Sequence, residues 1–253
     1  MKPRQVAAKQ GWQWLVEGFF LFRKNPLIWV VLCAILIAIS YVLIKIPFFG
    51  IVLNLILPVL VGGLMLGCQS LQEGGELQIA HLFACFRKNP GGLVTLGGVN
   101  LVGIILISFV VVLIGGKALE AVMAGGQGNL DISALTTHEN QVSLALLVGL
   151  ALYVPLAMAL WLSPVLVALR DVKAIVALKL SFIACLKNIP AFLIYSVVVF
   201  ILQIVIALLL GIMSISFSSR LIIALAAMLP VLIPALYISY KDIFSENLIH
   251  TES

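Results

Sequence analysis

The chain has 253 residues, of which 63% are hydrophobic and only 10% charged, whereas soluble domains are about 45–50% apolar and about 25% charged. A water-soluble globule could not cover this much apolar surface, so lipid is the expected solvent. The net charge of +5 does not indicate binding to nucleic acid, because the basic residues are scattered between apolar blocks and form no extended stripe.

The N-terminal segment is amphipathic and precedes the first long apolar block. Trp12, Leu15, Val16, Phe19 and Phe20 fall on one stripe of a helix, with polar residues elsewhere. We expect this helix to lie in the cytoplasmic interface, with its aromatic side chains at headgroup level. The apolar block that follows is long and no small-residue cleavage site comes after it, so we interpret it as a retained span and not as a secretory signal.

Six apolar blocks follow one another along the chain, each near the ~20 residues that cross a bilayer as a helix. They cover about residues 27–44, 48–68, 91–115, 143–169, 190–213 and 221–240. Only Lys45, Ile46 and Pro47 separate the first two blocks, so a single bent or re-entrant pair is the alternative there. We predict an all-α polytopic membrane protein with six transmembrane helices.

The distribution of Lys and Arg predicts the orientation, because positive residues near span ends stay cytoplasmic. With the N-terminus inside, three basic residues lie outside and twelve inside, and both termini are cytoplasmic. The outer three are Lys45, Lys117 and Arg220; the inner twelve are Lys2, Arg4, Lys9, Arg23, Lys24, Arg87, Lys88, Arg170, Lys173, Lys179, Lys187 and Lys241.

Residues 116–142 form the one sizeable loop of this topology, on the outer side. The segment is polar and contains four glycines between residues 116 and 128. We expect a solvated, flexible loop. A short amphipathic helix over residues 117–124 is the alternative.

The pattern Phe-x4-Lys-Asn occurs three times, each time just before a span. It starts at Phe19, Phe83 and Phe182, and the first two copies both contain Phe-Arg-Lys-Asn-Pro. The even-numbered spans share the tripeptide Pro-Val-Leu, beginning at Pro58, Pro164 and Pro230. The phase of the two patterns predicts a threefold repeat of an interfacial helix and a two-span hairpin, over residues 9–72, 73–170 and 171–245 of a single integral-membrane domain. Coincidence in a chain rich in Val and Leu is the alternative.

The Asn-Pro steps predict helix starts, because Asn is a favoured N-cap and Pro suits the first helical position. Asn25 and Asn89 are therefore candidate N-caps. The second Asn-Pro step, at Asn89, is preceded by the amphipathic set Ile79, Leu82, Phe83 and Phe86. Basic residues beside such interfacial aromatics can meet anionic lipid headgroups, or they can simply anchor the spans. The candidate headgroup contacts are Arg23, Lys24, Arg87, Lys88 and Lys187.

The run from Gly11 to Phe19 that leads into the first Phe-Arg-Lys-Asn-Pro resembles the N-terminal pattern of a family of bacterial inner-membrane proteins with no established activity. More loosely, the plan of repeated interfacial helix and hairpin looks like the membrane domain that accompanies some glycerophosphoryl diester phosphodiesterases. The resemblance implies an inner-membrane location and a six-span helical fold. It implies no activity.

The span cores contain no carboxylate, the side chain that would best indicate an ion or proton pathway. Their amides Asn54, Asn100 and Gln203 are expected to bridge helices by hydrogen bonds, and lining a path is the alternative. The only candidate acid–base cluster is His81 with Glu73 and Glu76, and a solvated polar face of an interfacial helix is the more ordinary interpretation. The sequence shows no catalytic, metal-binding or cofactor-binding motif.

We therefore expect an inner-membrane protein that is not an enzyme and whose interfacial helices engage lipid, anionic lipid included, or a partner protein. The alternative is a transport or export facilitator for a lipophilic molecule, with kinked spans forming a path. Small residues spaced four apart leave open whether helix packing serves the monomer or a homo-oligomer.

Overall fold

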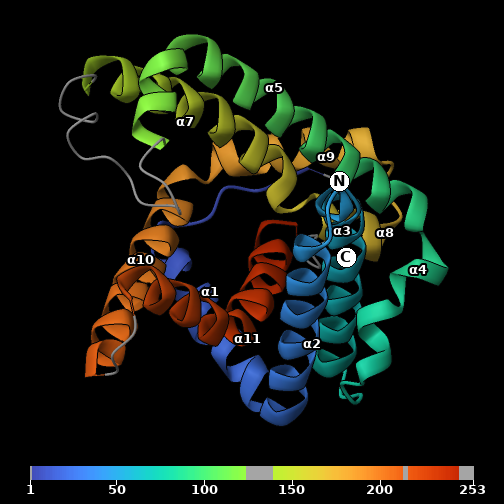
Figure 1. The fold of residues 1–253 in the computed structure, drawn as a ribbon. Helices are drawn as coiled ribbons and strands as arrows, with labels where there is room; N and C mark the ends of the chain where they lie inside the picture. The colour runs from blue at the N-terminus through green and yellow to red at the C-terminus, as the bar shows by residue number, and fades with distance from the viewer. Residues whose placement is uncertain (1, 124–138, 213–215, 245–253) are drawn as a thin grey trace.

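The computed structural model describes residues 2–123, 139–212 and 216–244, and the elements in these ranges are all helices (Figure 1). The helices are α1 Gln10–Arg23, α2 Pro26–Lys45, α3 Phe49–Gln72, η1 Ile79–Phe83, α4 Cys85–Lys88, α5 Pro90–Met123, α7 Glu139–Trp161, α8 Ser163–Arg170, α9 Ala174–Lys187, α10 Ile189–Leu209, η2 Leu210–Ile212 and α11 Phe217–Phe244.

Six segments of the described residues are long and apolar enough to cross a membrane, which confirms the six predicted spans. They are Pro26–Lys45, Phe49–Gln72, Pro90–Gly116, Asn140–Arg170, Ile189–Leu209 and Ser218–Phe244. The first two are separate helices joined by a tight turn, in which Phe48 takes a left-handed conformation (φ 66°). This geometry excludes a single bent helix across residues 27–68.

Helix α3 lies at the centre of the fold and packs against α2, α5, α8, η1 and α11. Its C-terminal half is buried nearly without interruption from Val59 to Leu71. A Cβ atom on Gly63 would lie 2.3 Å from the backbone oxygen of His81, so only glycine lets η1 approach this closely. The small residues of this span therefore serve packing within the chain.

The interfacial segments pack in a cyclic order around the fold. Helix α1 packs on α10 and α11, η1 and α4 pack on α3, and α9 packs on α7 and α8. Each predicted unit thus places its interfacial segment on the hairpin before it, and the first unit uses the last hairpin. Figure 1 shows α1 beside α10 and α11, two helices that are far from it in the sequence. This order is consistent with the predicted repeat, which itself stays a prediction.

The apolar stripe expected on α1 divides between two surroundings. Trp12, Phe19 and Phe20 are exposed as predicted, but Leu15 is buried. The buried face is a neighbouring one, made of Gly11, Trp14, Leu15, Gly18 and Leu21. Glycine at two of these positions brings the helix against the backbones of α10 and α11. Helix α1 is therefore docked on the bundle and does not merely rest on a lipid surface.

The fourth span is broken between α7 and α8, where Pro164 lacks the N–H that an uninterrupted helix needs. The Ser181 hydroxyl of α9 fills the break: it accepts from the Leu162 N–H at 3.0 Å and donates to the Met158 oxygen at 2.7 Å. A side chain inserted into the helical ladder in this way sustains a sharp bend.

The segment predicted as a loop, residues 116–142, is more helical than predicted in its described parts. Helix α5 continues through a break at Gly116 as far as Met123, which matches the alternative of a short helix, and α7 begins at Glu139. The centre of the predicted loop, residues 124–138, lies outside the described residues.

Candidate functional site

The lysines of the three Phe-x4-Lys-Asn copies point to backbone oxygens within the protein. The Lys24 ammonium donates to Leu71 O at 3.2 Å, in the last turn of α3, and the Lys88 ammonium donates to Ala168 O at 3.3 Å, in the last turn of α8. A cation at a helix C-terminus meets unpaired carbonyls and the negative end of the helix dipole. Lys187 instead donates to Pro3 O at 3.4 Å. All three candidate headgroup lysines thus also have structural roles.

The two arginines of the motif have no such inward partner. Arg23 and Arg87 are exposed, and neither guanidinium makes a hydrogen bond or ion pair with another described residue. Arg23 lies 5.9 Å from the centre of the Phe19 ring. Arg87 follows the pair Phe83 and Phe86, whose ring centres are 6.3 Å apart and whose side chains are more than two fifths exposed. In the first copy the guanidinium therefore lies beside an exposed aromatic ring, and in the second the exposed arginine follows two exposed aromatic residues in the sequence.

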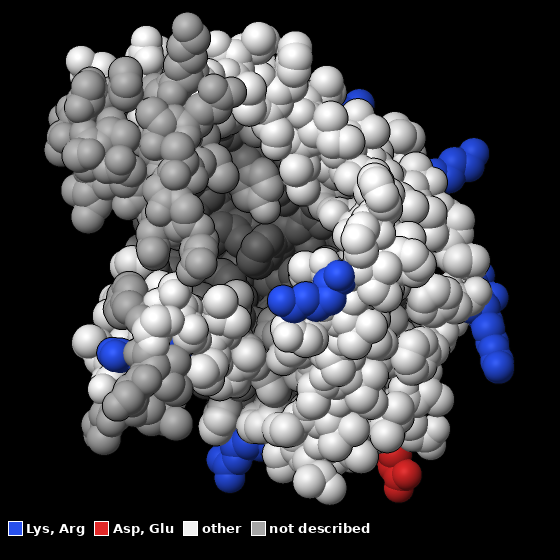
Figure 2. Space-filling view, in the orientation of Figure 1, with Lys and Arg blue, Asp and Glu red and all other residues white. Residues whose placement is uncertain are grey.

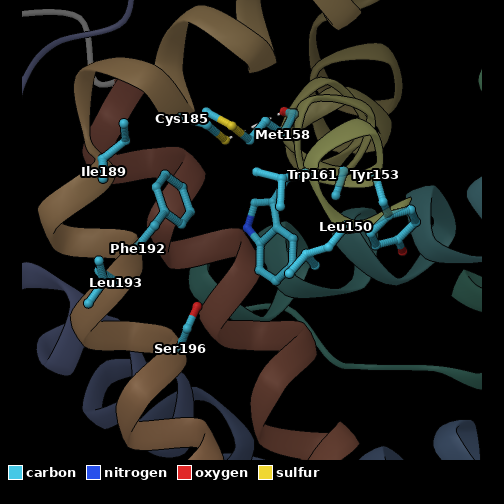
Figure 3. Close-up of a pocket in the computed structure, with 11 residues that line it drawn as sticks. Leu150, Tyr153, Met158, Trp161, Cys185, Ile189, Phe192, Leu193 and Ser196 are labelled. Carbon is cyan, nitrogen blue, oxygen red and sulfur yellow. Dashed lines mark hydrogen bonds between the residues drawn. The ribbon is translucent and has the colours of Figure 1, made fainter. Parts of the chain in front are cut away.

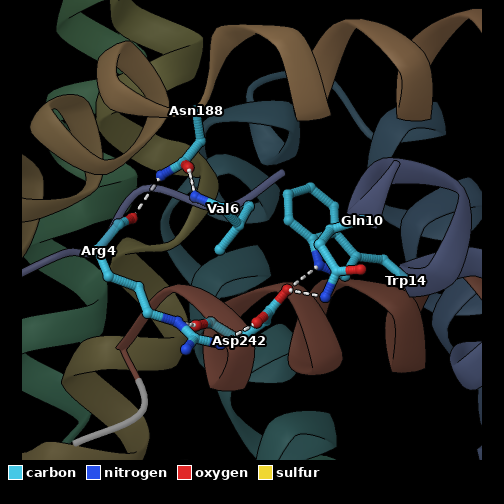
Figure 4. A network of polar contacts seen from close by, with 6 residues as sticks. All are labelled: Arg4, Val6, Gln10, Trp14, Asn188 and Asp242. Carbon is cyan, nitrogen blue, oxygen red and sulfur yellow. Dashed lines mark hydrogen bonds and ion pairs between the residues drawn. The ribbon is translucent and has the colours of Figure 1, made fainter. Parts of the chain in front are cut away.

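The three motif asparagines have three different roles. Helices begin at Pro26 and Pro90 as predicted. Asn89 caps α5, accepting from the Gly92 N–H at 3.3 Å, whereas the Asn25 side chain makes no cap hydrogen bond. Asn188, which is fully buried, holds the N-terminal segment: it accepts from the Val6 N–H at 2.8 Å and donates to Arg4 O at 2.9 Å (Figure 4).

We expect Asn89→Ala to lower the free energy of unfolding by about 0.5–2 kcal/mol through loss of the cap. Asn25→Ala is expected to have a smaller effect, because the Asn25 side chain makes no cap hydrogen bond that the substitution could remove. Unfolding of both variants in mixed micelles, followed by far-ultraviolet circular dichroism, gives the comparison. Equal losses would mean that the Gly92 contact contributes nothing.

The intramembrane amides join helices to one another. Asn100 of α5 donates to Asn54 of α3 at 2.9 Å, and Asn54 donates to Gly50 O. Gln203 of α10 donates to Leu221 O of α11 at 2.6 Å. None of the three lines the cavities described below. The three amides therefore make polar contacts between helices and do not line a shared path.

His81 and Glu73, two members of the candidate acid–base cluster, each make a local hydrogen bond. The His81 ring nitrogen Nδ1 accepts from the Gln78 N–H at 3.0 Å, while Glu73 accepts from Gln69 at 2.8 Å. Among the described residues no three His, Cys, Asp or Glu side chains gather where they could hold a metal ion.

A polar network at the end of the last span was not predicted from the sequence. The Asp242 carboxylate forms an ion pair with Arg4 and accepts at 3.0 Å from both Gln10 Nε2 and Trp14 Nε1 (Figure 4). The Arg4 N–H donates to Ile243 O at 3.0 Å. A carboxylate within one turn of a span's end was the available signal, but its partners are more than 220 positions away. The network ties the N-terminal segment, α1 and α11 together.

Two apolar cavities open on the surface of the spans. One, of about 410 Å³, lies between α7 and α10, where Trp161 meets the Phe192 ring edge-on at 6.2 Å (Figure 3). The other, of about 380 Å³, lies between α1, α10 and α11. Figure 2 shows one face of the molecule with few charged side chains and a hollow near its centre. The surroundings of both cavities suit an apolar occupant.

Comparison with known proteins gives one clear relative. A probable inner membrane protein of Burkholderia thailandensis is 33% identical over 208 residues, which cover 80% of this chain and 76% of the relative. No protein-family model matches the chain, and no solved structure matches it. The looser likeness to the membrane domain of diester phosphodiesterases therefore stays a prediction. On the extent and identity of the match, and with six membrane-spanning helices, this chain belongs to the same family of multi-pass inner-membrane proteins as its Burkholderia relative.

Proposed function

We propose that this inner-membrane protein is not an enzyme and that it binds anionic lipid headgroups through Arg23 and Arg87. The observation that carries the proposal is that the lysine and the arginine of the two identical Phe-Arg-Lys-Asn-Pro copies have different surroundings. In each, the lysine donates to a backbone oxygen of the protein and the arginine next to it in the sequence remains exposed; in the first copy its guanidinium lies near the exposed Phe19 ring. A guanidinium can bind a phosphate oxygen pair with two parallel hydrogen bonds.

The position of the motif favours lipid as the ligand. Arg23 and Arg87 lie three residues before Pro26 and Pro90, where two membrane spans begin. Side chains at such a boundary lie at the level of the headgroups, and a basic residue there contributes about 1 kcal/mol of attraction to an anionic surface. The exposed Phe19, Phe83 and Phe86 add apolar area at the same level.

The test is the double variant Arg23→Gln with Arg87→Gln. Native mass spectrometry of the purified protein measures how much phosphatidylglycerol it retains. Each of the two sites is expected to bind this lipid about 5-fold more weakly in the variant, from about 1 kcal/mol per arginine. The difference should shrink at high salt, because exposed charges are screened.

The matched control is Lys9→Gln with Lys179→Gln, which removes the same charge from two exposed lysines outside the motif. If control and double variant lose phosphatidylglycerol equally, the arginines act only through total charge and the proposed site does not exist.

The same proposal places both termini in the cytoplasm, supported by the twelve-to-three distribution of basic residues. In intact cells, cysteines introduced at Gln5 and Glu76 should resist an impermeant maleimide, and one at Ser218 should react. The native thiols give little background, because all four are buried. Burial also raises the pKa of Cys85 to about 11 and that of Cys185 to about 12, which keeps both protonated and unreactive. Labelling of Gln5→Cys from outside would contradict the orientation.

A second candidate function, facilitated movement of a lipophilic molecule, is favoured by the cavity between α7 and α10. Its walls belong to two membrane spans and carry Tyr153, Trp161 and Phe192 (Figure 3). The inter-helix bonding of Asn54, Asn100 and Gln203 leaves this candidate without a polar path, so it ranks second.

A further inference from the structure

The cavity lined by α1, α10 and α11 lies close to Arg23, one of the two residues proposed to bind a lipid headgroup. Phe19 lines the cavity, and the Arg23 guanidinium lies 5.9 Å from the centre of the same ring. The other lining side chains include Val16 and Phe20 of α1, Ile206 of α10, and Ala227 and Val231 of α11. A cation therefore lies near the edge of an apolar cavity of about 380 Å³.

The cavity has fixed walls. Helix α1 is held on α10 where Gly11 meets the Ala191 backbone, and on α11 where Gly18 meets the Ala235 backbone. The ion pair and hydrogen bonds of Asp242 fix the same helix at its N-terminal end. Because these contacts position α1 on both partners, the cavity does not need to form when a ligand arrives, which lowers the cost of binding.

We propose that this cavity holds an acyl chain of an anionic phospholipid whose phosphate is bound by Arg23. The inference rests on the proposed headgroup function and names the ligand as a whole lipid molecule. The charge of Arg23 favours a lipid with an anionic headgroup, and the apolar lining of the cavity favours a hydrocarbon chain. The volume lies within the range of about 300–1,000 Å³ that is usual for small-molecule sites, and well above the about 150 Å³ that holds benzene. The outer surfaces of α10 and α11, which are membrane spans, make the cavity continuous with the lipid phase.

The repeat does not by itself explain this site. Arg87, the equivalent residue of the second copy, has exposed aromatic neighbours in the sequence, but neither of the two described cavities includes Phe83 or Phe86. We therefore assign a complete lipid site to the first copy, and to the second only the headgroup contact.

The experiment uses phosphatidylglycerol with a photoreactive diazirine in one acyl chain, reconstituted with the full chain in phosphatidylethanolamine vesicles. Crosslinks mapped by peptide mass spectrometry should concentrate on α1, α10 and α11. Ala227→Phe fills the cavity and is expected to reduce these crosslinks about tenfold, since the loss of roughly two buried methylene groups suffices for that change. If the phenylalanine ring impairs folding, Ala227→Leu is the alternative variant. Its smaller side chain should reduce the crosslinks to an intermediate extent.

The control is Ala38→Phe, which adds the same ring at an exposed position of α2 that lines neither of the two described cavities. Crosslinks spread evenly over all lipid-facing helices, or unchanged in Ala227→Phe, would overturn the acyl-chain site. So would crosslinked dimers through α1 that disappear in Ala227→Phe, which would make a second copy the occupant.

Failure of the two proposals can be told apart. If salt-sensitive retention of phosphatidylglycerol depends on Arg23 and Arg87 but Ala227→Phe leaves the crosslinks unchanged, the headgroup function stands and the acyl-chain site is wrong. If Ala227→Phe removes the crosslinks while Arg23→Gln changes neither crosslinks nor retention, the cavity binds lipid without the headgroup contact, and both the headgroup function and the combined site proposed for Arg23 are wrong.

Discussion

Replacing Asp242 with alanine is expected to lower the free energy of unfolding by about 3 kcal/mol, because buried donors then lose a charged acceptor. Most of this loss should come from Trp14, whose indole N–H donates to the carboxylate from a side chain that is only 1% exposed. The ion pair with Arg4 contributes less, since the Arg4 side chain is 48% exposed and water screens it.

Unfolding in mixed micelles, followed by circular dichroism, measures the effect, with Lys241→Ala as the control at the adjacent exposed position. Trypsin cleavage near Arg4 and Lys9 should also become faster in Asp242→Ala, because the N-terminal segment loses an attachment. A variant as stable as Lys241→Ala, with unchanged cleavage, would show that the network is dispensable.

Replacing Gly11 with alanine should destabilise the protein more than the same replacement at any other glycine whose surroundings the structure describes. The added Cβ would lie 2.0 Å from Ala191 O and 2.8 Å from Tyr195 N, and both atoms belong to the backbone of α10. Overpacking typically costs about 1–3 kcal/mol, and we expect the upper end because a helix backbone cannot rotate away as a side chain can.

The same substitution at Gly91 is the control, since a Cβ there meets nothing within 4 Å. Gly91→Ala lies in the first turn of α5 and should be neutral or mildly stabilising, by up to about 1 kcal/mol from helix propensity. Thermal unfolding of both variants in detergent gives the comparison. Equal midpoints would mean that α1 is less tightly docked than the structure shows.

The spans were predictable because their signal is local. Each is an apolar block of nearly the length that the bilayer requires, and no distant residue is needed to recognise it. The helix starts at Pro26 and Pro90 were predictable for the same reason, since capping depends on adjacent residues.

The docked face of α1 was not predictable from its apolar stripe. In a membrane, a protein-facing side chain and a lipid-facing side chain are both apolar, so hydrophobic periodicity cannot separate Leu15, which is buried, from Phe19, which is exposed. The discriminating signal was small size, at Gly11 and Gly18. Partners such as Asp242 for Trp14, and Val6 for Asn188, join the two ends of the sequence and leave no local trace.

The docking of α1 on α10 and α11 also determines when folding can be completed during synthesis. Helix α1 leaves the ribosome before the two helices on which it docks, and these follow more than 160 residues later. At about 5–20 residues per second, α1 waits roughly ten to thirty seconds with its glycine face uncovered. A chain that stops before α10 would therefore not be a smaller stable protein, because its first helix has no place to dock; it would be an unfinished intermediate exposed to quality-control proteases from its N-terminal end onward.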